Sequence, residues 1–158
     1  MKYGFNVQYN GDAIAQTRPT ATVWAYAAAA VASGAVVEID TATDPPGGGT
    51  NAGVMAIKTM ASQKGIGAAV RAIAAGTWGE ICVLGIQEGV AVTGVVALND
   101  HLNCSTTDGT LVAAAQVATW DPNLYAGPMA RALSANSGGG GGGGTCTVEW
   151  FDVYGYGR

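Results

Sequence analysis

Charged side chains are scarce in this chain. Only 11% of its 158 residues are charged, about half the usual share for a soluble domain. Seven Lys and Arg residues, eleven Asp and Glu residues and one histidine give a formal net charge of −4. Because the few basic residues are spread over the whole length, they cannot form the positive footprint that nucleic-acid binding requires. We therefore expect no nucleic-acid partner.

Long apolar runs and a cysteine framework are missing as well. The most apolar run, Val23 to Ala32, has ten residues, whereas a membrane-spanning helix needs about 20. The first residues lack the basic and apolar regions of a secretory signal, so we expect neither a signal nor a membrane span. Cys82, Cys104 and Cys146 lack Cys-x-x-Cys spacing. We expect structural thiols in a reducing compartment, with one disulfide as the alternative, and the single histidine argues against zinc.

Small residues are abundant instead. Glycine supplies 25 positions and alanine 29, together 54 of 158. Glycine does not recur at every third position, which excludes a collagen-like chain. The hydrophobic share of 49% and the low net charge exclude a disordered tail. Seven consecutive glycines, Gly138 to Gly144, are expected to form a surface loop rather than an anion-binding nest.

From Ser33 onward the pattern is typical of β-strands. Short segments rich in β-branched and small residues are separated by glycine, Asn-Asp or Asp-Gly turn signals. The expected strands lie within Ala35–Asp40, Val54–Lys58, Gly65–Ala72, Gly79–Leu84, Gly89–Val96, Leu111–Ala114, Ala126–Leu133 and Thr145–Tyr154. Many short strands with regular turns predict an all-β fold over residues 33–158, either a small β-barrel or a β-sandwich.

Residues 1–32 are expected to form an extended N-terminal arm. The residue before Pro19 avoids the helical region. The alanine-rich segment Trp24 to Ala30 leaves two alternatives open: a short helix, because alanine has the best helix propensity, or an extended segment that docks its aromatic rings. An arm of this kind predicts that deleting residues 1–26 leaves the β domain folded but weakens assembly.

One internal repeat is visible. Gly67–Ile73 resembles Gly127–Leu133: in both, arginine follows glycine by four residues, and alanine and a branched aliphatic residue come next. Each copy is followed by a small-residue loop and a strand, at Glu80–Val83 and Thr145–Val148. The repeat predicts two strand–loop–strand hairpins and a barrel with approximate two-fold character, and chance similarity in an alanine- and glycine-rich chain is the alternative.

No catalytic constellation is found. His101 lies where a loop enters a strand, and Cys104 is three residues away. Positions three apart on a strand face opposite sides, which argues against a Cys–His pair. The acidic residues are scattered, and Glu38 and Asp40 are expected on one solvated strand face. We expect no catalytic residue, no metal site and no cofactor, and hence no enzyme.

The aromatic residues are concentrated near the two ends. Half of the twelve lie within residues 24–26 and 150–156. Aromatic anchors are typical of interfaces, although Trp150 and Tyr154 could instead pack inward from a last strand. The candidate interface residues are Tyr3, Phe5, Val23, Trp24, Tyr26, Trp120, Trp150, Tyr154 and Tyr156.

Three stretches carry a resemblance to a known family. They are Ala32–Ile39, Gly65–Gly76 with the strand Glu80–Leu84, and Val96–Leu102 with Asp108–Ala115. Together they resemble the small capsid cement (decoration) proteins of tailed bacteriophages, over roughly residues 33–153. The likeness is a pattern of small residues and hairpins, and the aromatic N-terminal arm, the Pro-Pro-Gly loop and the polyglycine run depart from it.

The resemblance implies a structural protein that binds the exterior of an assembled capsid and stabilises the shell. It implies the major capsid protein and neighbouring copies of the chain as partners, with a homotrimer favoured, a location on the virion and no catalytic residues. The alternative function is a carbohydrate- or ligand-binding β module of the head-fibre or adhesin type, with Trp24, Trp120 or Trp150 as the stacking platform.

Overall fold

The computed structural model describes residues 6–8, 20–46, 55–114, 129–136 and 143–151, and for residues 6–8 the backbone alone. Every named element in these ranges is a strand. The strands are β1 (Asn6–Gln8), β2 (Thr20–Ala27), β3 (Val36–Ile39), β4 (Ala56–Thr59), β5 (Gly67–Ala69), β6 (Thr77–Val92), β7 (His101–Cys104), β8 (Leu111–Ala113), β9 (Ala130–Ala132) and β10 (Gly144–Trp150). Within the described ranges, no helix has the length and apolar character needed to cross a membrane.

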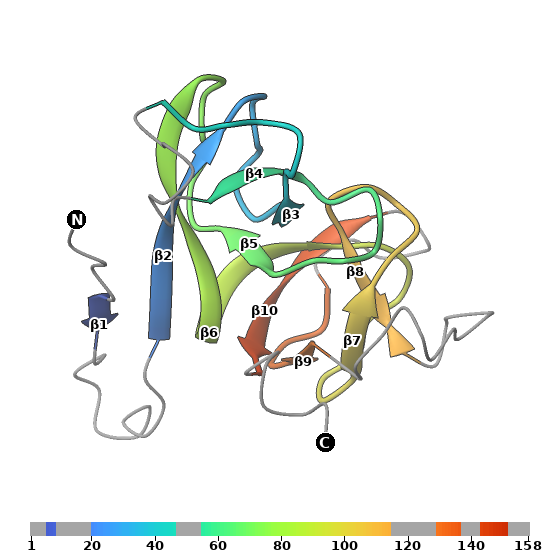
Figure 1. The fold of residues 1–158 in the computed structure, drawn as a ribbon. Helices are drawn as coiled ribbons and strands as arrows, with labels where there is room; N and C mark the ends of the chain where they lie inside the picture. Colours follow the sequence, from blue (N-terminus) through green and yellow to red (C-terminus); the bar gives the residue numbers. More distant parts are fainter. Residues whose placement is uncertain (1–5, 9–19, 47–54, 115–128, 137–142, 152–158) are drawn as a thin grey trace, which may run out of the picture.

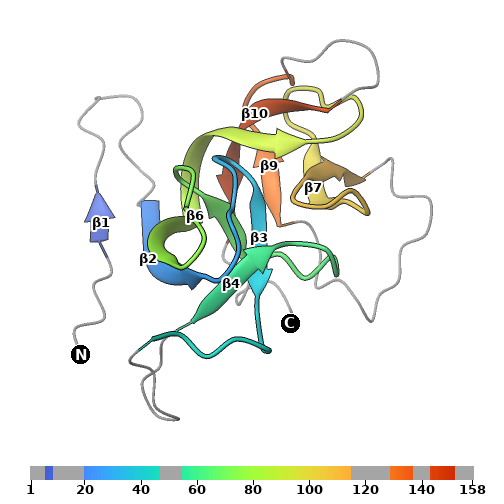
Figure 2. The same ribbon diagram turned by 90° about the horizontal axis from the view of Figure 1, so that it is seen from above.

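The ten strands form one mixed sheet in the order β1-β2-β4-β3-β5-β6-β10-β9-β7-β8. Two further pairings, β2 with β6 and β6 with β8, bring each half of the sheet back onto β6. Figures 1 and 2 show β2 beside the first half of β6 and β10 beside its second half. β2 and β5 pair with opposite edges of the first half of β6, and β10 and β8 pair with its second half. The all-β prediction is confirmed. The sheet is not one closed barrel but two curled halves that share a strand.

The shared strand β6 runs unbroken for 16 residues, where the sequence predicted two strands. The predicted break begins at Gly85, and the second predicted strand begins at Gly89; the φ angles of these two glycines are +90° and +69°. Glycine adopts positive φ without steric cost, so it can bend a strand at these positions without ending it. The partner strand β10 shifts register between Cys146 and Val148, as at a β-bulge. The prediction of two strands was wrong because these glycines redirect the strand.

Two hydrophobic cores share the strands β3, β5 and the first half of β6. Val36 and Ala68 belong to the larger core, whereas the next residues, Val37 and Ala69, belong to the smaller one. Successive side chains on a strand point to opposite faces. Runs of consecutive buried residues in β3 and β5 therefore mark strands that are covered on both faces.

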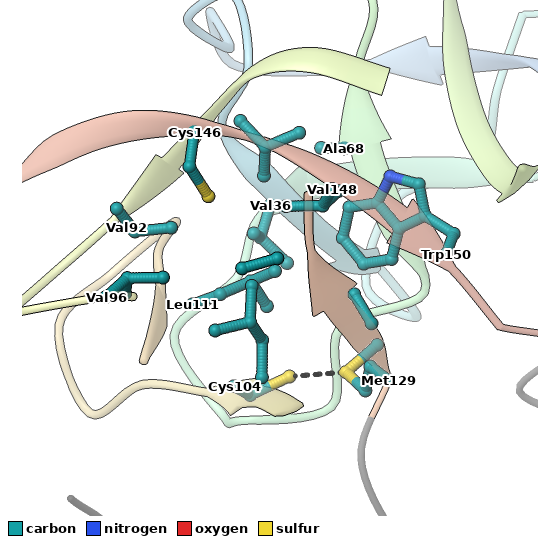
Figure 3. Close-up of a cluster of buried hydrophobic side chains, with 14 of the residues drawn as sticks. Val36, Ala68, Val92, Val96, Cys104, Leu111, Met129, Cys146, Val148 and Trp150 are labelled. Carbon is teal, nitrogen blue, oxygen red and sulfur yellow. Dashed lines mark hydrogen bonds between the residues drawn. The ribbon is translucent and has the colours of Figure 1, made fainter. Parts of the chain in front are cut away.

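The larger core is built around Trp150, which is 1% exposed. Figure 3 shows its indole ring packed among small aliphatic side chains, with Cys104 facing Met129 below. The indole N–H donates to the Gln87 side-chain oxygen at 2.9 Å. The Gln87 amide donates in turn to the carbonyl of Ala69 at 3.1 Å. These bonds avoid the cost of a buried unpaired polar group, about 1–3 kcal/mol.

Residues 20–32 belong to the folded domain and not to a separate arm. β2 pairs antiparallel with β6 over Ala21 to Ala27, and Ala25 and Ala27 are fully buried in the smaller core. Val31 forms an isolated bridge with Ile73. The extended alternative for this segment is therefore correct up to Ala27. Helix propensity is a weak preference that pairing with a neighbouring strand overrides.

The two predicted hairpins are present. β5 pairs antiparallel with β6, and β9 pairs antiparallel with β10. Ala68 lies opposite Cys82 in the first hairpin, and Ala132 lies opposite Val148 in the second. These pairs do not occupy equivalent positions of the sequence repeat, so the hairpin recurs but its register does not. Most of the polyglycine run lies outside the described residues, and Gly144 opens β10.

Candidate interaction surface

The outer face of the β2–β6 ladder carries three aromatic side chains. Trp24 and Tyr26 alternate along β2 with the buried Ala25 and Ala27, so they point away from the smaller core. Trp78 lies directly opposite Tyr26 on β6. We call Trp24, Tyr26 and Trp78 the aromatic patch.

Two side chains of the aromatic patch are exposed, and two of its rings are in contact. The ring centroids of Tyr26 and Trp78 are 5.6 Å apart with an interplanar angle of 61°, a favourable edge-to-face arrangement. Trp24 is 57% exposed and Trp78 is 41% exposed. Glu80 lies opposite Trp24, so the patch and this carboxylate occupy two neighbouring rungs on one face of the ladder.

Trp78 was not among the predicted interface residues, because the sequence analysis placed it in a loop. A usable signal was present: Trp78 and Glu80 alternate with the buried Gly79 and Ile81. The surrounding backbone is firmly packed. A Cβ atom on Gly79 would lie 2.5 Å from the side chain of Ile73. The core therefore supports the aromatic patch closely from beneath.

A second exposed apolar feature is the loop of residues 93–100 between β6 and β7, which we call the apolar loop. Its Val95 and Leu98 side chains are 57% and 59% exposed. The Asn136 side chain bonds two backbone groups of the loop, at 2.9 and 3.3 Å. The Asp100 carboxylate accepts a loop backbone N–H at 2.8 Å. These bonds hold the loop so that both apolar side chains face outward.

The remaining predicted interface residues divide into two groups. Val23 is half-buried against the smaller core. Trp150 is buried in the larger core, which corrects its assignment to a contact surface and agrees with the inward-packing alternative. Five other candidates lie outside the described residues: Tyr3, Phe5, Trp120, Tyr154 and Tyr156.

The three cysteines are free and buried, as expected for structural thiols. Burial raises the pKa of each thiol, at Cys82, Cys104 and Cys146, to about 11. Cys104 Sγ lies 2.9 Å from Met129 Sδ and accepts the Gly65 backbone N–H at 3.3 Å. Because the thiolate is the reactive form, these protonated thiols are poor nucleophiles and poor metal ligands at neutral pH.

His101 and Cys104 do not form a pair in the structure. It is exposed on β7, whereas Cys104 is 1% exposed in the larger core, which confirms that the two residues face opposite sides. His101 lies opposite Arg131, whose guanidinium bonds Glu149 at 2.7 Å. Its ring also meets Phe151 edge-on, with centroids 6.3 Å apart. Among the described residues, no three His, Cys, Asp or Glu side chains are grouped to hold a metal ion.

Glu38 is buried, contrary to the expected solvated face. Its side chain is 5% exposed and lies 3.5 Å from the Lys58 ammonium. Burial raises the pKa of Glu38, but hydrogen bonds from the Ser62 side chain and backbone and the charge of Lys58 outweigh this and leave the pKa below its usual value. Hydrogen bonds from Thr43 and from the backbone lower the pKa of Asp40 as well. Both carboxylates are thus engaged in local structure.

No protein-family model and no curated protein matches the sequence. Among solved structures, the chain is similar to the head fiber gp8.5 N base of bacteriophage phi29, with a TM-score of 0.54 at 16% sequence identity. The superposition covers 84% of this chain and 95% of the phage protein. At this level of identity the likeness shows a shared fold, and it extends over nearly the whole of both chains.

Proposed function

We propose that the chain is a structural protein of a bacteriophage virion, attached to the outer surface of the capsid. The observation that carries the proposal is the fold shared with a phage head-fibre base over 84% of this chain. A match of this extent involves both curled halves and not merely a common hairpin. The resemblance of residues 33–153 to capsid decoration proteins supports the same class on separate grounds.

The chemistry of the described residues is consistent with a role that involves no catalysis. The thiols are protonated and buried, and Glu38 is held by Ser62 and Lys58. Catalysis needs convergent groups within hydrogen-bond reach of one reacting atom. Arg131 likewise bonds Glu149, and Asp40 accepts a hydrogen bond from Thr43.

The partners we propose are the major capsid protein and neighbouring copies of this chain, in a trimer. The apolar loop offers the contact to the capsid, because Val95 and Leu98 are exposed on a braced backbone. A trimer would present three such loops. Multivalent attachment converts modest single contacts into tight binding when the geometry allows simultaneous engagement.

The test is co-sedimentation of the purified chain with phage particles that lack it. We expect saturable binding with a copy number that is a multiple of three. Replacing Val95 and Leu98 together by aspartate should weaken binding about tenfold or more, since charge at a buried contact costs at least about 1.4 kcal/mol. A control that adds the same charge elsewhere, Ala61→Asp with Thr106→Asp, should bind normally. Absence of saturable binding would overturn the proposal.

Two more specific roles, cement protein and head-fibre base, remain within the class of virion structural proteins. They differ in their effect on the stability of the capsid. A cement protein stabilises the capsid, so particles without it should release their DNA at a lower temperature. A head-fibre base, which the structural match specifically favours, should leave the release temperature unchanged. Thermal release from particles with and without the chain separates the two roles.

A further inference from the structure

We propose that the aromatic patch is a carbohydrate-binding surface for a neutral or amino-sugar polysaccharide. This function goes beyond capsid attachment and uses a different face of the molecule, the outer side of the β2–β6 ladder and not the apolar loop. Its elements are Trp24, Tyr26 and Trp78 together with the carboxylate of Glu80.

The kinds of side chain on this face favour a sugar. The two rungs, Trp24 with Glu80 and Tyr26 with Trp78, present three rings and one carboxylate. Aromatic rings carry a negative face, on which the C–H groups of a pyranose ring can pack. Sugar hydroxyls can donate to a carboxylate, which accepts through two oxygens. A sugar ring can make both contacts at once: the C–H groups of its flat face pack on an aromatic ring, and the hydroxyl groups at its edge donate to the carboxylate.

The negative charge of this face further limits the kinds of carbohydrate that can bind. Glu80 is the ionisable group that stands beside Trp24 on the ladder, and the whole chain carries a net charge of −4. A polyanionic glycan would be repelled. A second copy docked two-fold on the same patch would enclose both Glu80 carboxylates in one interface, because such an interface uses the same patch of both copies. A neutral or cationic glycan is not repelled by the negative charge, and its binding does not place two Glu80 carboxylates in one interface.

The geometry fits an extended chain. Trp24 and Tyr26 are two residues apart on one strand, a rise of about 6.8 Å, so the rings form a row along β2. Trp78 widens the row at one end through its contact with Tyr26. Packing of Ile73 against Gly79 beneath the ladder fixes the backbone. A preformed platform of this kind loses little entropy when a ligand binds.

The test uses the full-length chain and calorimetric titration with cellohexaose, chitohexaose and mannohexaose as probes. We expect saturable binding of at least one probe. Trp24→Ala and Trp78→Ala should each weaken that binding about tenfold or more, equivalent to about 1.4 kcal/mol. Trp24→Phe should retain part of the affinity because it keeps a ring. Ile39→Ala removes an exposed apolar side chain outside both proposed surfaces and should leave glycan binding unchanged.

Three outcomes would overturn the proposal. They are no saturable binding of any probe at millimolar concentration, binding that both tryptophan variants retain in full, and an oligomer that dissociates when Trp24 is replaced, which would assign the patch to a second copy. Thermal unfolding of each variant, expected near that of the unmodified chain because both rings are exposed, separates lost binding from lost folding. Capsid co-sedimentation is scored independently, so either proposal can fail alone.

Discussion

At the scale of single residues, two glycines share a backbone conformation but not an environment. Gly34 and Gly89 have φ angles of +74° and +69°. A Cβ atom on Gly34 would overlap the carbonyl oxygen of Gly89, whereas a Cβ atom on Gly89 would meet nothing within 4 Å. Substitutions at these two glycines can therefore distinguish the strain of a left-handed conformation from the steric overlap of closely packed backbones.

We predict that Gly34→Ala destabilises the fold much more than Gly89→Ala. Both variants carry the strain of a left-handed alanine, about 1–2 kcal/mol. Gly34→Ala must also displace backbone, for which overpacking typically costs about 1–3 kcal/mol more. Urea unfolding measures the two free energies directly. Equal losses would show that the backbone near Gly34 can move aside freely.

For Glu38 and Trp78, the sequence did not predict the environment of the side chain. Trp78 lies on a strand segment with alternating exposed and buried residues, and Glu38 lies on a strand that the sequence located. Their environments differ because of neighbours far along the chain: Ser62 and Lys58 enclose Glu38, and β2 brings Tyr26 opposite Trp78. A short stretch of sequence gives the alternation of side chains but not what covers each face.

At the scale of elements, the turn signals located β3, β4 and β8 within a residue or two. The sequence split β6 into two strands, left β2 open between a helix and an extended segment, and did not include β7 among the expected strands. Local patterns treat Gly85 and Gly89 as breaks and an alanine run as a helix, since glycine and alanine have those intrinsic preferences. Pairing between β2 and β6 decides both cases. It joins residues 50 or more positions apart, for which the sequence carries no local signal.

We predict that removing residues 1–26 abolishes cooperative unfolding, contrary to the expectation for a free arm. The truncation deletes nearly all of β2, including the fully buried Ala25, and exposes one edge of β6 and the smaller core. Circular dichroism during urea titration should show a broad, shallow transition. Removing residues 1–19 deletes β1, which pairs with β2 at the end of the described strand order, and should preserve a sharp transition. A sharp transition in both truncations would contradict this account.

At the scale of the whole molecule, the two cores are linked by the strands that they share. β3, β5 and β6 each contribute side chains to both cores, as Ile81 and Cys82 do from adjacent positions of β6. Losing either core uncovers one face of the same strands. The two curled halves therefore cannot behave as independent domains, even though each has its own interior.

We predict that both halves unfold in a single transition. Trp150 lies in the larger core, and Trp78 lies on the ladder that covers the smaller core. Variants that keep one of these tryptophans, with the others replaced by phenylalanine, report on each half by fluorescence. Two-state unfolding requires the two urea transitions to coincide.

Leu111→Ala provides the matched perturbation, because Leu111 is fully buried in the larger core alone. A buried leucine replaced by alanine costs about 2–5 kcal/mol. If the cores are coupled through β3, β5 and β6, the midpoint reported by Trp78 should fall as far as the midpoint reported by Trp150. A shift confined to Trp150 would mean that the shared strands keep their structure when the larger core is lost, and that each half folds alone.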